Sequence, residues 1–192
     1  MKVSRAQAEE NRNRIVDVAS ALFREHGFDG VGVADLMKAA GLTHGGFYGN
    51  FKSKEELAAK ASERALSKNI ARLSGVIEDA KGDRLSALVT SYLSERHIEE
   101  RGDGCAFSAL GADAARRGTL LRSAFTKGVE DYLAQLSGIV PGRTKAEKRK
   151  QAMATLSGMV GALVLARAVD DANLAKEILA ATAASLTTPP TG

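Results

Sequence analysis

The sequence predicts an all-α protein. Only three prolines and no tryptophan occur in 192 residues, and alanine and leucine are abundant, which favours helices over sheets. Apolar residues recur at helical spacing along most of the chain. Two capping boxes, Ser53-Lys54-Glu55-Glu56 and Thr144-Lys145-Ala146-Glu147, are typical of helix starts. We therefore expect helices joined by short loops.

The bulk composition is that of a globular protein, with 44% hydrophobic and 26% charged residues. The single cysteine excludes an internal disulfide framework and fits a reducing compartment. No apolar run approaches the roughly 18 residues of a membrane span, and no signal-like segment opens the chain. We therefore expect a cytoplasmic protein without a membrane partner. A net charge of +4 is compatible with a nucleic-acid partner but does not require one.

The first third of the chain predicts a helix-turn-helix. A first helix over residues 9–26 is closed by a glycine, and a second covers residues 33–40. Gly41 then acts as a left-handed C-cap. With Thr43 as its N-cap, a short third helix over residues 44–51 follows. This order of helix, tight turn and short helix is the one that places a recognition helix in the DNA major groove.

The short third helix carries polar residues and glycines that suit DNA contact better than a core. Two glycines inside a helix cost about 1 kcal/mol each relative to alanine, and they allow the backbone to approach another surface closely. Side chains beside them can reach base edges or phosphates, and a lysine in the next helix can reach a phosphate. The candidate DNA contacts are Thr43, His44, Gly45, Gly46, Tyr48, Asn50 and Lys54. An ordinary corner between two helices with a solvated tip is the alternative.

The same residues resemble the signature of TetR-family transcriptional repressors. The resemblance rests on the run Leu36-Met37-x-Ala39-Ala40-Gly41-Leu42-Thr43-x-Gly45-Gly46-Phe47-Tyr48-x-Asn50-Phe51-x-Ser53-Lys54-Glu55-x-Leu57. It implies an all-helical homodimer with an N-terminal DNA-binding domain and a larger C-terminal domain for effector binding and dimerisation. The DNA contacts that it implies fall on the seven residues named above. Val31 and Gly32 depart from the usual Thr or Ser, and Asn50 departs from the usual His or Tyr.

The rest of the chain predicts a helical second domain. Its helices are expected at residues 53–79, 85–100, 120–139, 145–169 and 172–186, with a loop at 101–104 and a further helical segment opening at Cys105. We divide the chain into a DNA-binding domain over residues 1–52, with a helical tail to about 60, and a ligand-binding and dimerisation domain over 61–186. Residues 187–192 are expected to form a disordered tail.

Cys105 is the candidate for redox or electrophile sensing. A thiol at a helix N-terminus has a lowered pKa and a larger thiolate fraction. The Gly-Cys step also resembles a TetR subgroup that includes electrophile-responsive repressors. Free cysteines are, however, commonly buried and inert, so lining a ligand pocket or simple packing stays open. Other candidates for an effector cavity are Tyr92, His97, Phe107, Phe125 and Met159.

The last two helices carry more apolar surface than one subunit needs. Small residues alternate there with larger ones, which permits close helix–helix approach, so a C2 four-helix interface is expected. Burial of the pair within one subunit is the alternative. The interface candidates are Met153, Leu156, Ser157, Val160, Gly161, Val164, Ile178 and Ala181.

No catalytic or metal-binding pattern is present, and no cofactor is implied. The prediction is a dimeric DNA-binding regulator, most simply a repressor that a small-molecule or thiol-reactive effector releases from a pseudo-palindromic operator. A helical ligand-binding module without specific DNA binding is the alternative.

Overall fold

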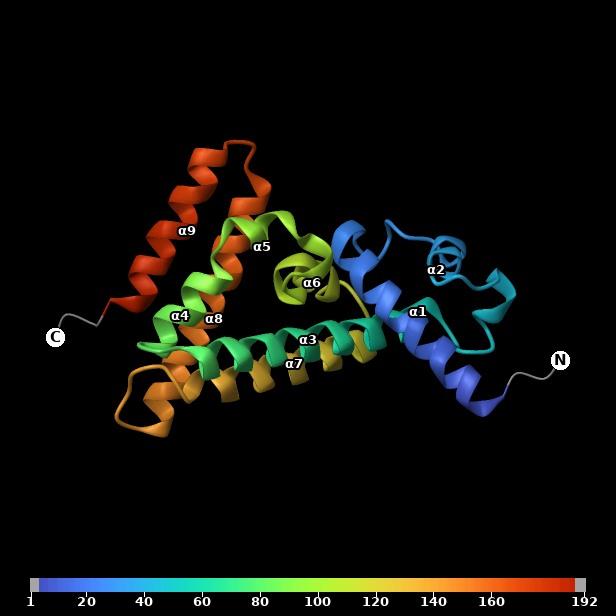
Figure 1. Cartoon of the computed structure of the whole chain (residues 1–192), viewed down its shortest axis with the longest axis horizontal. Helices are drawn as coiled ribbons and strands as arrows, with labels where there is room; N and C mark the ends of the chain where they lie inside the picture. Colours follow the sequence, from blue (N-terminus) through green and yellow to red (C-terminus); the bar gives the residue numbers. More distant parts are fainter. Residues whose placement is uncertain (1–3, 189–192) are drawn as a thin grey trace. The chain divides into compact units, whose positions relative to one another are not determined.

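The computed structural model describes residues 4–188, and every regular element in this range is a helix, which confirms the all-α prediction (Figure 1). The described chain falls into two compact units. Unit 1 comprises the chain up to Ser67 together with Arg101–Lys127, and unit 2 comprises Lys68–Glu100 together with the chain from Gly128 onward. Helices α3 and α7 each belong partly to one unit and partly to the other.

Unit 1 is built around α1, which packs against α2, η2 and α6. Its elements are α1 (Arg5–His26), α2 (Val33–Ala39), η1 (His44–Gly46), the first half of α3 (Lys54–Asp79), η2 (Arg101–Asp103), α6 (Ala106–Ala114) and the start of α7 (Thr119–Ser137). The core residues exposed by 2% or less include Ile15, Ala19, Phe23, Leu36, Met37, Phe47, Phe51 and Leu57. The predicted apolar stripes of the first three helices therefore meet in one core.

The ends of α1 and α2 follow local turn chemistry. α1 begins four residues earlier than predicted, because the Ser4 hydroxyl accepts a hydrogen bond from the Gln7 amide. After α2, Gly41 has φ +69°, the Leu42 amide donates to Met37 and the Gly41 amide donates to Lys38. This pair of bonds is a Schellman motif. The predicted left-handed glycine cap of the second helix is thus confirmed.

The predicted third helix over residues 44–51 is wrong as a regular α-helix. The segment contains one 3₁₀ turn, His44–Gly46, followed by a separate turn in which the Phe51 and Asn50 amides donate to Phe47. The Thr43 side chain makes no cap hydrogen bond. Glycines at 45, 46 and 49 explain the break, because each weakens helix formation in a segment of barely two turns.

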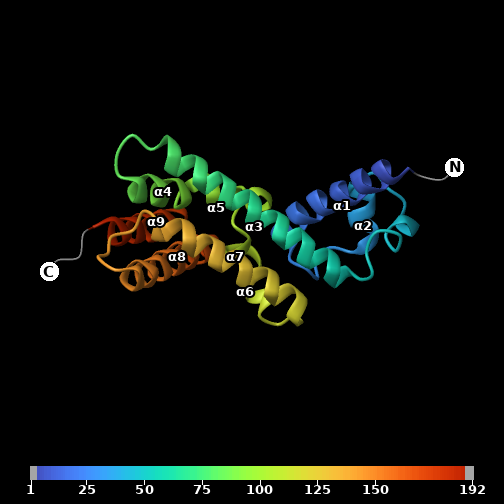
Figure 2. The ribbon, with the colours of Figure 1, turned by 90° about the horizontal axis from the view of Figure 1, so that it is seen from below.

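Unit 2 contains the second half of α3, α4 (Arg84–Tyr92), α5 (Glu95–Glu99), the end of α7, α8 (Lys145–Ala168) and α9 (Ala172–Thr187). The helix predicted over 85–100 is wrong, since it divides into α4 and α5. Leu93 leaves the helical conformation at φ −88°, ψ 57°, and the Ser94 hydroxyl caps α5 by accepting from the His97 amide. α8 and α9 pack closely as neighbours (Figure 2).

The start of α8 confirms the second predicted capping box. The Glu147 amide donates to the Thr144 hydroxyl, and the Glu147 carboxylate accepts from the Thr144 amide. At the other end of this unit, Thr187 closes α9 and Thr188 is its cap. Residues 189–192 of the predicted tail lie outside the described residues.

Candidate nucleic-acid interface

The segment between α2 and α3 has one buried and one exposed side. Phe47 and Phe51 are 1% and 2% exposed, and their rings lie 5.9 Å apart between centroids. Tyr48 is 71% exposed, and its ring stands edge-on to His44 at 6.4 Å and to Phe47 at 5.2 Å. The buried phenylalanines therefore anchor the segment while Tyr48 and His44 face outward. An outward tyrosine and histidine can donate and accept hydrogen bonds at base edges or phosphates.

Asn50 serves the segment itself. Its side-chain amide donates to the Gly46 carbonyl at 2.8 Å, and it is half-buried. The Arg12 guanidinium donates to the Asn50 carbonyl and lies over the Phe51 ring at 4.1 Å. Arg12 also pairs with Glu56 at 3.1 Å. Arg12 thus holds the end of the recognition segment on α1, a role that the sequence did not indicate.

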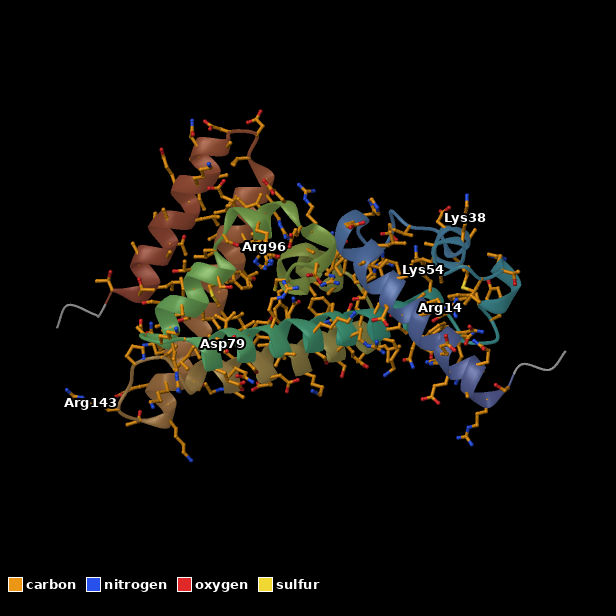
Figure 3. The ribbon with its side chains drawn as sticks, viewed as in Figure 1. Arg14, Lys38, Lys54, Asp79, Arg96 and Arg143 are labelled. Carbon is orange, nitrogen blue, oxygen red and sulfur yellow. The ribbon has the colours of Figure 1, made fainter. Side chains whose placement is uncertain are left out.

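Lys54 is the first residue of α3, where a positive side chain is unfavourable for the helix dipole but suits a phosphate. Figure 3 shows Lys54, Lys38 and Arg14 on the helices of unit 1. The helix end itself is capped by Ser53, whose hydroxyl accepts from the Glu56 amide at 3.1 Å, while the Glu56 carboxylate accepts from the Lys52 amide at 2.8 Å. Because of this amide and of Arg12, the pKa of Glu56 lies below its ordinary value.

The glycines of the segment are not required by the fold. Gly45, Gly46 and Gly49 do not have positive φ. A Cβ at Gly45 would meet nothing within 4 Å, and at the other two it would make ordinary contacts of 3.5 Å or more. By contrast, Val31 is buried at 4% exposure and Gly32 caps α2 without a side chain. The usual phosphate-touching hydroxyl at the start of α2 is therefore absent.

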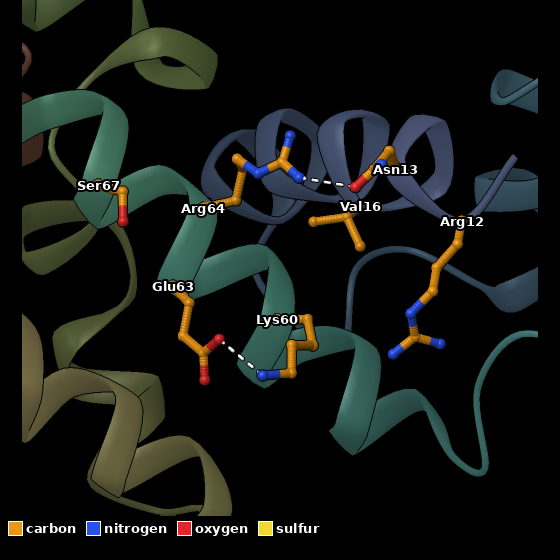
Figure 4. A pocket seen from close by; sticks show the side chains of 7 residues that line it. All are labelled: Arg12, Asn13, Val16, Lys60, Glu63, Arg64 and Ser67. Carbon is orange, nitrogen blue, oxygen red and sulfur yellow. Dashed lines mark hydrogen bonds and ion pairs between the residues drawn. The ribbon is translucent and has the colours of Figure 1, made fainter. Parts of the chain in front are cut away.

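A hollow of about 260 Å³ lies between α1 and α3, with Arg12, Lys60 and Arg64 on its walls (Figure 4). Every one of these cations has an acidic partner: Arg64 pairs with Asp17 at 3.0 Å and Lys60 with Glu63 at 2.8 Å. The Arg64 guanidinium also donates to Asn13. The charges that line the hollow are therefore neutralised by ion pairs, which connect α1 to α3.

This geometry agrees with a match to a family sequence model. The model described as bacterial regulatory proteins, tetR family, matches residues 15–61, which include the whole helix-turn-helix. Residues 15–61 form a TetR-family DNA-binding domain. The matched segment is the DNA-binding domain of a bacterial regulator.

Individual TetR-family proteins match over larger parts of the chain. The transcriptional repressor NemR of Escherichia coli is 28% identical over 131 residues, covering 67% of this chain and 66% of that protein. The regulator AcrR of Shigella flexneri is 38% identical over 87 residues, covering 44% of this chain and 40% of that protein. The matched part thus spans less than two thirds of each of these relatives.

Solved TetR-family structures share the whole fold. The reduced form of E. coli NemR aligns with a TM-score of 0.77 and 24% identity over 95% of this chain and 100% of that chain. A TetR regulator from Chloroflexus aurantiacus aligns with a TM-score of 0.78 and 25% identity over 95% of this chain and 97% of that chain. The all-helical architecture of the family therefore extends beyond the DNA-binding segment.

The helix that begins after Cys105, α6, packs against α1 of the same unit. The buried Arg24 of α1 donates to the Gly104 carbonyl at 2.8 Å. Arg117, just after α6, pairs with Asp29 at 2.5 Å in the loop before α2. The hydrogen bond and charge of Arg117 lower the pKa of Asp29, with smaller contributions from Lys54 and Arg116. No sequence pattern indicates these contacts, because they join residues 80 or more positions apart.

The predicted effector residues divide between the two units. In unit 1, Cys105 is 1% exposed, and the Phe107 and Phe125 rings lie edge-to-face at 5.8 Å. In unit 2, Tyr92 and His97 lie edge-to-face at 4.7 Å, and Met159 is fully buried.

His97 is held neutral in unit 2. Burial is the largest cause that lowers its pKa, and the charges of Arg167, Arg72 and Arg96 act in the same direction against the hydrogen bond to Tyr92; together they bring the pKa to about 4. The Nδ1 atom lies 2.7 Å from the Tyr92 carbonyl oxygen, which can only accept, so Nδ1 carries the proton.

The predicted dimer residues form an exposed stripe on α8 and α9. Met153 and Val164 are 43% and 41% exposed. Ser157 and Ala181 are also exposed, while Val160, Gly161 and Ile178 are half-buried. Leu156 is an exception, since it is only 7% exposed and packs inside its own subunit. Leu165 and Leu174, at 56% and 43%, are exposed apolar residues that the prediction did not include.

Proposed function

We propose that the chain is a dimeric transcriptional repressor that binds a pseudo-palindromic operator through the segment from Thr43 to Lys54. The observation that carries this proposal is the anchored recognition segment, with Phe47 and Phe51 buried and Tyr48 and His44 outward. In a C2 dimer, two such segments would bind half-sites about one helical turn apart, ~34–36 Å. Thr43, Gly45, Gly46 and Lys54 complete the candidate contact surface, and Asn50 supports its backbone.

The dimer part of the proposal rests on the apolar stripe of α8. Among the described helices, α8 is the one long and apolar enough to cross a membrane by length and composition alone. Its exposed apolar residues lie on one side, while the opposite side packs against α9 and α5, which suits a partner helix better than lipid. We place the protein in the cytoplasm, with the DNA-binding function over residues 1–52 and effector binding and dimerisation over 61–186.

The effector part concerns Cys105 and the aromatic residues. A small molecule that favours one dimer conformation would lower operator affinity by population shift. Modification of Cys105 by an electrophile or oxidant would do the same. Since Cys105 is 1% exposed, its reaction would require local opening at the start of α6. A Cys105→Ser variant that still releases DNA on oxidant treatment would exclude the redox version.

The test is fluorescence anisotropy of the purified protein with DNA from upstream of its own gene, against scrambled DNA over a salt series. Wild type is expected to prefer the native fragment. Lys54→Ala should weaken binding to all sequences and reduce the salt slope by about 1, because one phosphate contact is lost. Tyr48→Ala should reduce the preference for the native fragment.

Lys81→Ala is the matched control, because Lys81 is exposed in the loop after α3 and lies outside the recognition segment. It should bind as wild type does. If wild type binds both DNAs equally and weakly, and operator-sized fragments from neighbouring genes do no better, the regulator proposal fails and the ligand-binding module replaces it.

A further inference from the structure

The net charge of the chain is concentrated at the start of α8. Residues 143–150 contain five Lys or Arg and one Glu, which gives +4. Outside this segment 22 basic residues (27 less 5) face 22 acidic ones (23 less 1), so the rest of the chain is neutral. These eight residues therefore carry the entire formal charge of the protein.

The one acid in the segment does not neutralise these cations. The Glu147 carboxylate accepts from the backbone amides of Arg143 at 2.6 Å and Thr144 at 3.1 Å. These contacts, with the Thr144 hydroxyl, already cap the end of α8. The Glu147 carboxylate is thus engaged by backbone amides, and among the described residues it forms no ion pair with the cations of the segment.

Three of these cations line a hollow of about 300 Å³ between α7 and α8. Lys145, Lys148 and Arg149 come from α8, and the α7 side consists of Glu130, Leu133, Ala134 and Ser137. Arg149 pairs with Glu130 at 2.8 Å. Neither Lys145 nor Lys148 forms an ion pair within the described residues, so the hollow holds two uncompensated ammonium groups.

Lys148 is held in place by the preceding loop. Gly142 has φ +152°, and a Cβ there would lie 2.9 Å from Lys148 Cγ and 3.0 Å from the Lys148 amide nitrogen. Only glycine allows the loop to run so close, and Lys148 is half-buried as a result. Lys148 and Arg149 follow Lys145 by three and four residues, so their like charges lie close together on one face of α8. An anion between them would relieve this repulsion.

We propose that the α7–α8 hollow is an anion-binding site for a small phosphorylated molecule. Two ammonium groups, the Arg149 guanidinium and the Ser137 hydroxyl surround a space that suits a phosphoryl group, whose oxygens accept several charged hydrogen bonds at once. Buried Leu133 and exposed Ala134 offer an apolar floor for the rest of the molecule. The site is separate from the residues of the proposed DNA and effector sites.

The shape favours a small anion over nucleic acid. The cations that line the hollow come from one side of α8, whereas Arg143 and Lys150 are exposed outside it, with Arg143 in the loop before α8 (Figure 3). The α1–α3 hollow is the internal comparison, because it also holds three cations, yet acidic partners balance all of them. In the α7–α8 hollow, by contrast, only Arg149 of the three lining cations has an acidic partner in the part of the chain that the structure describes.

The test is isothermal titration of the full-length protein with pyrophosphate and with inorganic phosphate, at constant ionic strength in chloride. The variant Lys145→Gln/Lys148→Gln removes two charges from the hollow. Its matched control, Arg143→Gln/Lys150→Gln, removes two charges from the same segment outside the hollow. We expect wild type and the control to bind pyrophosphate alike, and the hollow variant to lose at least tenfold in affinity.

The circular dichroism spectrum and Tm of both variants establish that they fold, and removal of like charges should not lower the Tm. Equal losses in the two variants would reduce the effect to general charge and overturn the proposal. Absence of pyrophosphate binding by wild type would also overturn it. A non-operator duplex that binds wild type and displaces pyrophosphate, with equal losses in both variants, would assign the surface to nucleic acid instead. None of these outcomes depends on operator binding.

Discussion

Arg12 shows how one side chain can position a recognition surface that it does not belong to. It donates to the Asn50 carbonyl, stacks over Phe51 and pairs with Glu56. Because the exposed ion pair alone contributes little, the stacking and the carbonyl contact are what fix the segment against α1. In the sequence, Arg12 is indistinguishable from solvated arginines such as Arg14 nearby, since its partners lie some 40 residues away.

At the same scale, His97 should make stability depend on pH. Its folded pKa of about 4 lies below the ordinary 6.5, so the unfolded chain binds more protons between these values. The contribution of His97 to the free energy of unfolding is therefore fully present above pH 6.5 and is lost as the pH falls toward 4. It amounts to roughly 2–3 kcal/mol for a shift of this size in a largely buried group. Urea unfolding at pH 7.5, 5.5 and 4.5 measures it.

His97→Gln is the informative variant, because glutamine can still donate to the Tyr92 carbonyl but does not titrate. Its free energy of unfolding should change much less between pH 7.5 and 4.5 than that of wild type. The carboxylates with lowered pKa values, such as Asp83 and Glu56, act below this range, since their ordinary values are 3.8 and 4.5. If the free energy of unfolding changes equally with pH in the two proteins, His97 is not the group that causes the change.

At the scale of elements, local signals predicted helix ends well wherever one residue type decides the backbone. Gly41 was expected in the left-handed conformation and has φ +69°. The Thr144 capping box and the first turn of α3 were likewise readable from three-residue spacings. The break at Leu93 was missed, because apolar spacing continues through it and no Gly or Pro marks it. Ser94, a good N-cap residue, was the available signal.

The recognition segment was predicted as a helix because its phenylalanines are four residues apart. In the protein without DNA, the glycines at 45, 46 and 49 weaken this helix, and the structure shows two separate turns instead. None of the three is needed for packing, so a Cβ can be added without strain. We expect the segment to become helical against the major groove, and the cost of this ordering to lower operator affinity.

Gly49→Ala should therefore stabilise the protein by about 0.5 kcal/mol and raise operator affinity by up to about fivefold, through a lower ordering cost. Anisotropy titration and urea unfolding measure the two effects. Gly75→Ala in α3, where a Cβ also meets nothing within 4 Å, is the control and should raise stability alone. A fall in affinity for Gly49→Ala would instead mean that the DNA approaches the backbone too closely for a methyl group.

At the scale of the whole molecule, the grouping of distant segments was beyond the reach of sequence patterns. Residues 101–127 join the DNA-binding helices in one compact unit, through contacts such as Arg24 with Gly104 and Arg117 with Asp29. Periodicity shows that α6 is helical and partly apolar, but it does not show which surface the helix covers. A change at Cys105 would be one residue away from a carbonyl that α1 holds, so unit 1 itself links the thiol to the recognition domain.

The proposed dimer provides the last test, since operator binding by two half-sites requires two chains. Val164→Asp places a charge in the exposed stripe of α8, where an apolar partner is expected, and burial of an unpaired carboxylate is costly. Light scattering should then give the mass of one 20.2 kDa chain, where wild type gives twice that value. Operator affinity should fall at least a hundredfold, because each half-site then binds alone.

Leu120→Asp makes the same change at a residue that is more exposed, 52% against 41%, and lies on α7. It should keep both the dimer mass and the affinity. If Val164→Asp stays dimeric while Leu120→Asp dissociates, the partner surface lies on α7 and the α8–α9 assignment is wrong.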